Sequence, residues 1–204
     1  MAQRELFSCE SALPSGLLHR PEFITAAEEA ALLEGIGTLD LREAQYKEYT
    51  AKRRVASFGA GYDFDENELT PAPVMAAFLL PLRAKVAAWA RVPEEEFGYA
   101  LVSEYRAGTQ LGWHRDVPQF EMVAGVSLAG PATMRFRRFP PRPHAEILTL
   151  PLQPRSAYIL RDEARWGWQH SIPPTPSLRY SITFRTRRQP QAAAHIPRRP
   201  LPGP

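Results

Sequence analysis

Near its C-terminal end the chain reads Arg179-Tyr180-Ser181-Ile182-Thr183-Phe184-Arg185. Alternate side chains of a β-strand point to opposite faces, so one face of this stretch is polar and the other is apolar. The polar face carries Arg179, Ser181, Thr183 and Arg185, and the apolar face carries Tyr180, Ile182 and Phe184. The stretch predicts a strand whose polar face lines the interior of a barrel. An edge strand whose arginines point into water is the alternative that the stretch alone leaves open.

The two arginines of this polar face also predict a ligand. Two buried guanidiniums are costly unless an anion neutralises them. A small acid with a carboxylate at each end would neutralise Arg179 and Arg185 through charge-assisted hydrogen bonds. If the strand faces inward, it therefore indicates a binding site for a dicarboxylate.

The second half of the chain is rich in β-forming residues. Short candidate strands are separated by turn signals such as Gly130-Pro131 and Pro173-Pro174-Thr175-Pro176. We expect strands at 100–105, 122–128, 133–137, 147–152, 156–160 and 178–186, with an earlier one at 53–58. About seven or eight such strands suggest an antiparallel double sheet.

Two helices are expected before these strands. Thr25-Ala26-Ala27-Glu28 has the spacing of a capping box and opens a helix that ends near Gly35. Apolar residues at helical spacing predict a second helix over about 72–90, which Pro81 kinks or delimits. The fold class is therefore α+β and mainly β, a jelly roll with N-terminal buttressing helices.

Length and composition limit the class of protein. With 204 residues we expect a single domain over 1–188, with its core at about 98–188, and a disordered Pro/Arg tail at 189–204. No stretch approaches the ~20 apolar residues that cross a bilayer. Cys9 is the one cysteine, which excludes an internal disulfide. We expect a cytoplasmic monomer that does not bind membranes.

Charge is distributed unevenly along the chain. Residues 135–204 hold 13 Lys and Arg against 3 Asp and Glu, a formal charge of +10, and the remaining 12 and 19 give −7. All the basic residues of the C-terminal segment are arginines, which suit planar binding of phosphate or carboxylate. Nucleic acid is the partner that this pattern favours. Arginines that only solvate strand faces are the alternative.

A candidate metal site accompanies the strand of arginines. His114 and Asp116 are two residues apart, so on a strand both side chains face the same way. His170 follows far downstream, nine residues before Arg179. Two imidazoles and one carboxylate are the ligand set of a non-haem ferrous site and leave positions open for other ligands. Each motif alone is more often structural, and their combination in this order favours the metal site.

Residues 98–188 resemble the AlkB-like 2-oxoglutarate- and Fe(II)-dependent dioxygenases. The resemblance rests on four motifs of this sequence, Ser103-Glu104-Tyr105-Arg106-Ala107-Gly108, Gly112-Trp113-His114-Arg115-Asp116, Gln169-His170-Ser171 and Arg179-Tyr180-Ser181-Ile182-Thr183-Phe184-Arg185. It implies a double-stranded β-helix and the cofactors Fe(II), 2-oxoglutarate and O₂. It also implies that iron is bound by His114, Asp116 and His170.

The resemblance further implies how 2-oxoglutarate is held. Arg179 and Tyr105 would bind its distal carboxylate, and Arg185 would lie near its metal-chelating end. Ser103 and Ser181 stand where the family often has Asn, which keeps hydrogen-bonding groups there. Acidic residues that touch the target base in some members are replaced by Val117-Pro118-Gln119.

Substrate-binding candidates are basic and aromatic residues. Enzymes that treat a base stack it in a pocket after extruding it, and they contact phosphates with cations. The candidates are Arg53, Arg54, Phe58, Trp113, Trp166 and Trp168. Core packing is the alternative for each aromatic residue.

These observations give one leading hypothesis and two alternatives. The leading one is oxidative demethylation of alkylated bases in DNA or RNA, as in DNA repair, with release of formaldehyde. One alternative is the same chemistry on a protein or a small molecule. The other is a non-catalytic β-domain that binds nucleic acid.

Overall fold

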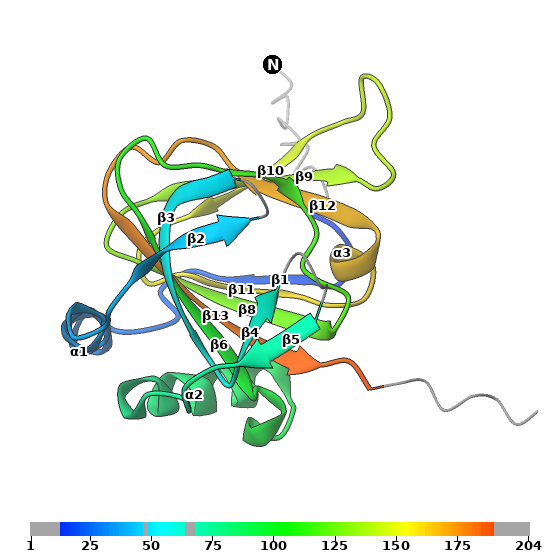
Figure 1. The fold of residues 1–204 in the computed structure, drawn as a ribbon. Helices are drawn as coiled ribbons and strands as arrows, with labels where there is room; N and C mark the ends of the chain where they lie inside the picture. The colour runs from blue at the N-terminus through cyan, green and yellow to red at the C-terminus, as the bar shows by residue number, and fades with distance from the viewer. Residues whose placement is uncertain (1–12, 47–48, 64–67, 190–204) are drawn as a thin grey trace, which may run out of the picture.

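The computed structural model describes residues 13–46, 49–63 and 68–189 of the chain. Cys9 and nearly all of the predicted tail at 189–204 lie outside these residues. Two antiparallel sheets face each other, and two helices lie against the outer side of the larger one (Figure 1). This is the predicted mainly β jelly roll with buttressing helices.

The larger sheet has seven strands. Their order is β1 (Leu17–Arg20), β11 (Ala157–Leu160), β8 (Phe120–Leu128), β13 (Arg179–Arg187), β6 (Tyr99–Tyr105), β3 (Tyr49–Phe58) and β2 (Arg42–Tyr46). The smaller sheet has the order β10 (Leu148–Leu152), β9 (Ala132–Arg138), β12 (Trp168–Ile172) and β7 (Leu111–His114). A separate hairpin is formed by β4 (Ala60–Asp63) and β5 (Glu68–Pro71).

Strand β13 lies in the middle of the larger sheet, between β8 and β6. Its apolar side chains Ile182 and Phe184 are fully buried in the core between this sheet and the helices. The opposite face of the sheet packs on the smaller sheet through a second core, which includes Tyr158, Phe136 and Leu150. The alternation of 179–185 is therefore explained by two different buried environments, and the edge-strand alternative is wrong.

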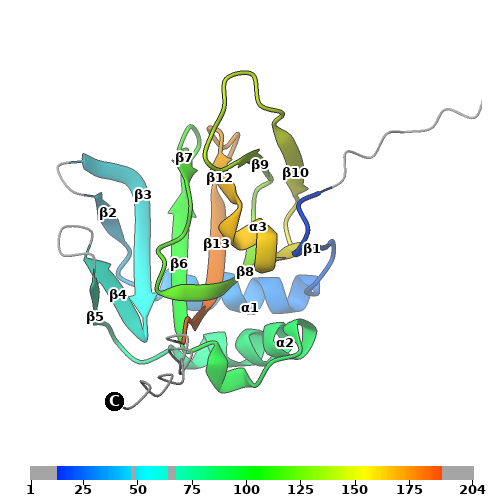
Figure 2. The ribbon, with the colours of Figure 1, turned by 90° about the vertical axis from the view of Figure 1, so that its right-hand side faces the viewer.

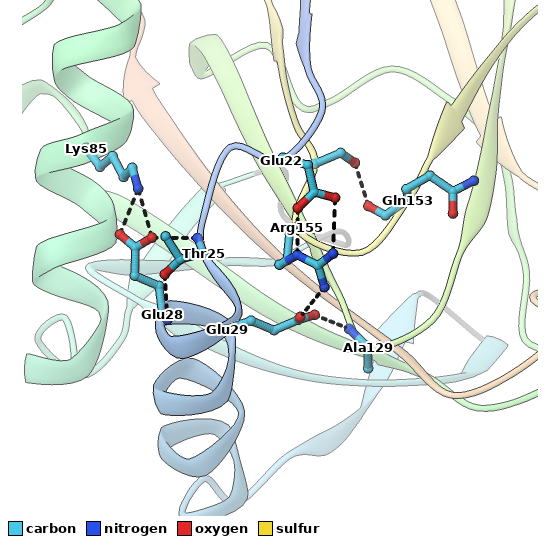
Figure 3. Close-up of polar contacts among 9 residues, drawn as sticks. Glu22, Thr25, Glu28, Glu29, Lys85, Ala129, Gln153 and Arg155 are labelled. Carbon is cyan, nitrogen blue, oxygen red and sulfur yellow. Dashed lines mark hydrogen bonds and ion pairs between the residues drawn. The ribbon is translucent and has the colours of Figure 1, made fainter.

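Helix α1 (Ala26–Gly37) begins at the predicted capping box. The Glu28 backbone N–H donates to Thr25 Oγ1 at 3.1 Å, and the Thr25 N–H donates to Glu28 Oε2 at 2.7 Å. Lys85 of helix α2 (Leu80–Ala90) binds the same Glu28 carboxylate at 2.7 Å (Figure 3). This ion pair lowers the pKa of Glu28 and joins the two helices.

A second polar cluster fixes α1 to the turns of the barrel (Figure 3). The buried Glu29 accepts from the Ala129 backbone N–H at 2.9 Å and from Arg155 at 3.2 Å. Arg155 also binds Glu22, which lies in the segment before α1, at 2.9 Å. Because Ala129 follows β8 and Arg155 precedes β11, these contacts set the helix on the larger sheet.

The second helix is shorter than predicted. It begins at Leu80, after a 3₁₀ turn at Ala77–Leu79, and Pro81 lies in its first turn. The backbone N–H groups of the first turn of a helix have no acceptor within the helix, so a proline there loses no hydrogen bond. Pro81 therefore starts this helix and does not kink it. Two short elements complete the description, a 3₁₀ turn at Glu94–Glu96 and helix α3 (Asp162–Trp166). Within the described ranges, no helix is long and apolar enough to span a bilayer.

Candidate active site

Two strands of the smaller sheet bring three candidate metal ligands together. Strands β7 and β12 pair so that His114 lies opposite His170, with their ring centroids 4.3 Å apart. Asp116 follows β7, and its Oδ2 lies 3.6 Å from His170 Nε2. One ligand atom from each of the three residues lies within 4.8 Å of the others. The arrangement is compact enough for all three to share one ion.

The protonation states of the three side chains suit a cation. Burial lowers the pKa of His114 and lowers that of His170 to about 3, so both rings are neutral near pH 7. Burial acts to raise the pKa of Asp116, but electrostatic interactions, of which that with Arg185 at 3.4 Å is the largest, outweigh burial and the pKa falls. Two neutral imidazoles and one carboxylate are ready to coordinate.

The His114 ring is oriented by its own strand. Its Nδ1 lies 2.9 Å from the Gly112 carbonyl oxygen, which can only accept. The Nδ1 therefore carries the proton, and Nε2 keeps its lone pair for a metal. A hydrogen bond from the second ring nitrogen of this kind is what fixes a metal-binding histidine.

Arg179 lies at the other end of the interior face, with 1% of its surface exposed. Its Nε donates to Ser127 Oγ at 3.0 Å, and its guanidinium lies 5.0 Å from the centroid of the Tyr105 ring. None of the ion pairs between described residues includes Arg179. A buried cation without an acidic partner is costly, so this position requires an anion.

Hydroxyl groups line the floor between Arg179 and the ligands. Ser103, Ser181 and Ser127 are paired in register across β6, β13 and β8, and all three are buried. Tyr105 is buried beside them and accepts from Arg53 at 3.4 Å. Burial raises the pKa of Tyr105, but Arg53 and Arg179 together lower it overall. Sequence reasoning missed Ser127, because its role depends on strand pairing and no motif marks it.

The family model described as the 2OG-Fe(II) oxygenase superfamily matches residues 16–185. The chain belongs to this superfamily. Its cofactors are Fe(II), 2-oxoglutarate and O₂. The residues present suit them, because the donor set is that of a ferrous site and the buried Arg179 lacks an anion. The chain is a 2-oxoglutarate- and Fe(II)-dependent dioxygenase, and the non-catalytic alternative is wrong.

Relatives place the oxygenase among the AlkB-like members. It is 29% identical to the "Alkylated DNA repair protein ALKBH8 homolog" of Arabidopsis thaliana over 78% of this chain and 51% of that protein. It is 26% identical to the mouse "tRNA (carboxymethyluridine(34)-5-O)-methyltransferase ALKBH8" over 80% of this chain and 25% of that protein. It is also 26% identical to "Uncharacterized protein L905" of Acanthamoeba polyphaga mimivirus, over 80% and 81% of the two chains.

Solved structures confirm the fold of the oxygenase. OsALKBH1 superposes with a TM-score of 0.62 at 13% identity, over 86% of this chain and all of the other. A prolyl-4-hydroxylase of Pseudomonas putida superposes with a TM-score of 0.60 at 14% identity, over 86% and 94%. The jelly roll predicted from the sequence is therefore shared with both proteins.

The two candidate arginines of β3 point to opposite faces of the larger sheet. Arg53 reaches Tyr105, whereas its neighbour Arg54 points to the opposite face. There Arg54 binds the buried Glu104 through two hydrogen bonds of 2.8 and 2.7 Å. Phe58 is 6% exposed and packs in the core below the helices. The structure therefore gives Arg54 and Phe58 structural contacts, and it does not bring them to the ligands.

The three candidate tryptophans lie in three different places. Trp113 precedes His114 on β7 and lies on the outer face, where Arg135 and Arg137 cover its ring. Trp168 is 6% exposed and packs in the core between the sheets. Trp166 is half-buried, and its Nε1 donates to Glu121 at 3.1 Å. The three side chains do not form one pocket wall.

Arg165 holds the backbone at the candidate ligand Asp116 and in the residues that follow it. It is 2% exposed, and one of its terminal nitrogens donates to the carbonyl oxygens of Asp116, Val117 and Phe120 at 3.1, 2.8 and 2.8 Å. No motif of the sequence marked this residue. Its contacts are made across a separation of at least 45 residues, which only the fold reveals.

We expect Arg165→Met to weaken iron binding and to lower the stability of the protein. The change leaves three carbonyl groups without this donor, at a cost of about 3 kcal/mol. Iron titration and thermal unfolding measure the two effects. The control is Arg161→Met, since Arg161 is half-exposed and its ion pair with Asp162 is long, at 3.8 Å. Equal behaviour of the two variants would show that Arg165 does not position the loop.

Tyr158 is a third residue that sequence reasoning missed, after Ser127 and Arg165. It is buried on β11 opposite Gly125, and a Cβ added at Gly125 would overlap the phenol ring. Burial raises its pKa, so the hydroxyl stays protonated and is able to donate. Its ring packs in the core between the two sheets.

We expect Gly125→Ala to raise the concentration of 2-oxoglutarate needed for half-maximal turnover. The added methyl group forces the Tyr158 ring toward the interior, and overpacking of this kind costs about 1–3 kcal/mol. Succinate formation at varied 2-oxoglutarate concentration measures the effect. The control is Gly112→Ala, because nothing lies within 4 Å of a Cβ added there. An unchanged requirement in the Gly125 variant would remove Tyr158 from the site.

Proposed function

We propose that the oxygenase removes alkyl groups from bases in DNA or RNA by oxidative demethylation. The observation that carries the proposal is the compact set of His114, Asp116 and His170 on the smaller sheet, facing the sheet that carries the buried Arg179, which has no acidic partner among the described residues. The Arabidopsis and mouse relatives are named for alkylated DNA repair and for a tRNA methyltransferase, which supports a nucleic acid as the substrate. These relatives are longer than the matched region, so their whole activities are not carried over.

The proposed roles follow from the geometry. His114 Nε2, Asp116 and His170 would bind iron, and Arg179 with Tyr105 would bind the distal carboxylate of 2-oxoglutarate. Ser103 and Ser181 lie on the floor between them, and Arg185 contacts Asp116 at the metal end. Arg53 would extend this polar surface toward the substrate.

When bound, iron with 2-oxoglutarate and O₂ supplies the oxidising power for hydroxylation of a C–H bond. One oxygen atom of O₂ enters succinate, CO₂ is released, and the other atom enters the substrate. A hydroxylated N-methyl group then leaves as formaldehyde, and the nitrogen regains a proton. The residues of the chain would bind 2-oxoglutarate and the nucleic acid, and they would hold the alkyl group at the metal end.

A panel of substrates tests the proposal. The protein is supplied with Fe(II) and 2-oxoglutarate and then given methylated single-stranded DNA, RNA and peptides. We expect formaldehyde and succinate in equal amounts from a nucleic acid, and neither product in His114→Ala. Formaldehyde from peptides alone would support the alternative substrate class. A single domain over 1–188, a monomeric state and a cytoplasmic location stay predictions from the sequence.

A further inference from the structure

The outer face of the smaller sheet carries a cluster of arginines and aromatic rings. The face that points away from the larger sheet bears Trp113, Arg115, Arg135, Arg137 and Phe139, which together we call the arginine face. Figures 1 and 2 show helices α1 and α2 on the far side of the larger sheet, and neither helix covers the arginine face. Arg115 and Phe139 are exposed and Trp113, Arg135 and Arg137 are partly exposed, so a partner could reach the face.

Aromatic rings hold the three arginines in fixed positions. The guanidiniums of Arg135 and Arg137 lie 5.0 and 4.5 Å from the Trp113 ring, and that of Arg115 lies 3.7 Å from the Phe139 ring. A guanidinium stacked on a ring keeps a fork of N–H donors free at its edge. Less conformational entropy is lost when such a fork binds an oxyanion.

The hydrogen-bond partners of these arginines are neutral. Arg135 Nε donates to Ser171 Oγ at 3.1 Å and Arg137 Nε donates to Gln169 Oε1 at 2.8 Å. Arg115 donates to the backbone carbonyl oxygen of Trp166 at 3.1 Å. Other arginines of the chain, such as Arg54, are paired with carboxylates. Among the ion pairs of the described ranges none includes the three arginines, so three positive charges lack a counter-charge.

The arginine face lies directly behind the candidate metal ligands. Trp113 precedes His114 on β7, and Gln169 and Ser171 flank His170 on β12. Because side chains alternate along a strand, these residues point outward where the ligands point inward. A chain bound to this face would pass the same two strands that hold the site.

We propose that the arginine face binds the sugar-phosphate backbone of the nucleic-acid substrate. The proposal rests on the proposed function for the identity of the polyanion. The three charges and their rigid N–H forks match phosphate oxygens in both sign and geometry. Contacts of this kind set position and affinity and do not read the base, which remains the task of the interior.

The test compares two pairs of arginines with the same change in charge. Arg135→Gln combined with Arg137→Gln removes two charges from the arginine face. Arg20→Gln combined with Arg91→Gln removes two exposed charges from a hollow beside α2, where Arg20 also lies near an aromatic ring, 6.0 Å from Phe23. Binding of a labelled, unmethylated single-stranded RNA and DNA is measured by anisotropy at several salt concentrations.

We expect the first pair to weaken binding by about tenfold at low salt and to reduce the slope of log affinity against log salt by about 1.4, as for two lost phosphate contacts. The second pair should stay within about twofold of the unchanged protein. Arg135→Lys combined with Arg137→Lys keeps the charges and should retain most of the binding. This variant also decides the case if the glutamine pair fails to fold.

Three outcomes overturn the proposal. They are equal losses in both pairs, no loss in the first pair, and a protein that binds polyglutamate but no oligonucleotide. Because the assay uses unmethylated strands without iron, it is independent of the reaction. A protein that binds oligonucleotides through the arginine face but releases no formaldehyde from methylated oligonucleotides would contradict the proposed function. The proposal that the arginine face binds nucleic acid would still hold.

Discussion

Turnover of 2-oxoglutarate is expected to disappear when Asp116 is replaced by alanine. Asp116 is the one carboxylate in the set, and its oxygen lies 3.6 Å from His170 Nε2. Without it two imidazoles remain, and the site loses the negative charge that offsets Arg185 and a divalent ion. Changing even the residues that support metal ligands costs 10–100-fold in metal affinity, so loss of a ligand should exceed that range.

The measurement combines iron content with succinate formation. Asp40→Ala is the matched control, because Asp40 is exposed and pairs with Arg42 at the surface, at 2.8 Å. The control should bind iron and turn over like the unchanged protein. His170→Ala gives a second test that does not disturb Arg185. Full activity in Asp116→Ala, with iron bound, would show that the ligand assignment is wrong.

The strand that begins at Arg179 illustrates what the sequence was able to predict. Its polar and apolar residues alternate because each face is buried in a different environment, so the pattern was visible in one short stretch. His114 and Asp116 were recognised as a pair by their spacing of two residues, but Asp116 lies beyond the end of β7, so strand alternation does not account for its position. Local periodicity was sufficient for the strand at Arg179 alone.

The substrate candidates show where sequence reasoning failed. Arg53 and Arg54 were grouped together, although neighbouring residues of a strand point in opposite directions. Which of the two faces inward depends on the pairing of β3 with β6, where Glu104 lies 50 residues from Arg54 in the chain. Strand alternation also places Trp113 on the outer face when its neighbour His114 points to the interior. The choice of Trp113 as a substrate-binding candidate was therefore an avoidable error.

Other residues of the site left no local signal. Ser127 and Tyr158 reach the interior only because β8 pairs with β13 and with β11. Arg165 acts on a loop that precedes it by at least 45 residues. Strands β7 and β12 were not predicted either, because they are short and their ligand residues interrupt any simple hydrophobic pattern. Long-range pairing determines these features, and one sequence does not reveal it.

Replacing Arg179 with alanine is expected to raise the requirement for 2-oxoglutarate far more than it weakens iron binding. The guanidinium is almost fully buried, and its Nε donates to Ser127 Oγ at 3.0 Å. A bidentate pair with a carboxylate would supply about 2–4 kcal/mol at this position. The loss corresponds to roughly 30- to 1,000-fold in the half-saturating concentration.

Succinate formation at varied 2-oxoglutarate concentration measures this change, and an anaerobic iron titration measures the metal separately. Arg54→Ala is the matched control, since Arg54 lies on the opposite face of the same sheet and pairs with the buried Glu104. The control should lower the melting temperature, because it leaves a buried carboxylate unpaired, but it should not alter the requirement for 2-oxoglutarate. If Arg179→Ala and Arg54→Ala needed the same concentration of 2-oxoglutarate for half-maximal turnover, Arg179 would have to bind an anion other than 2-oxoglutarate.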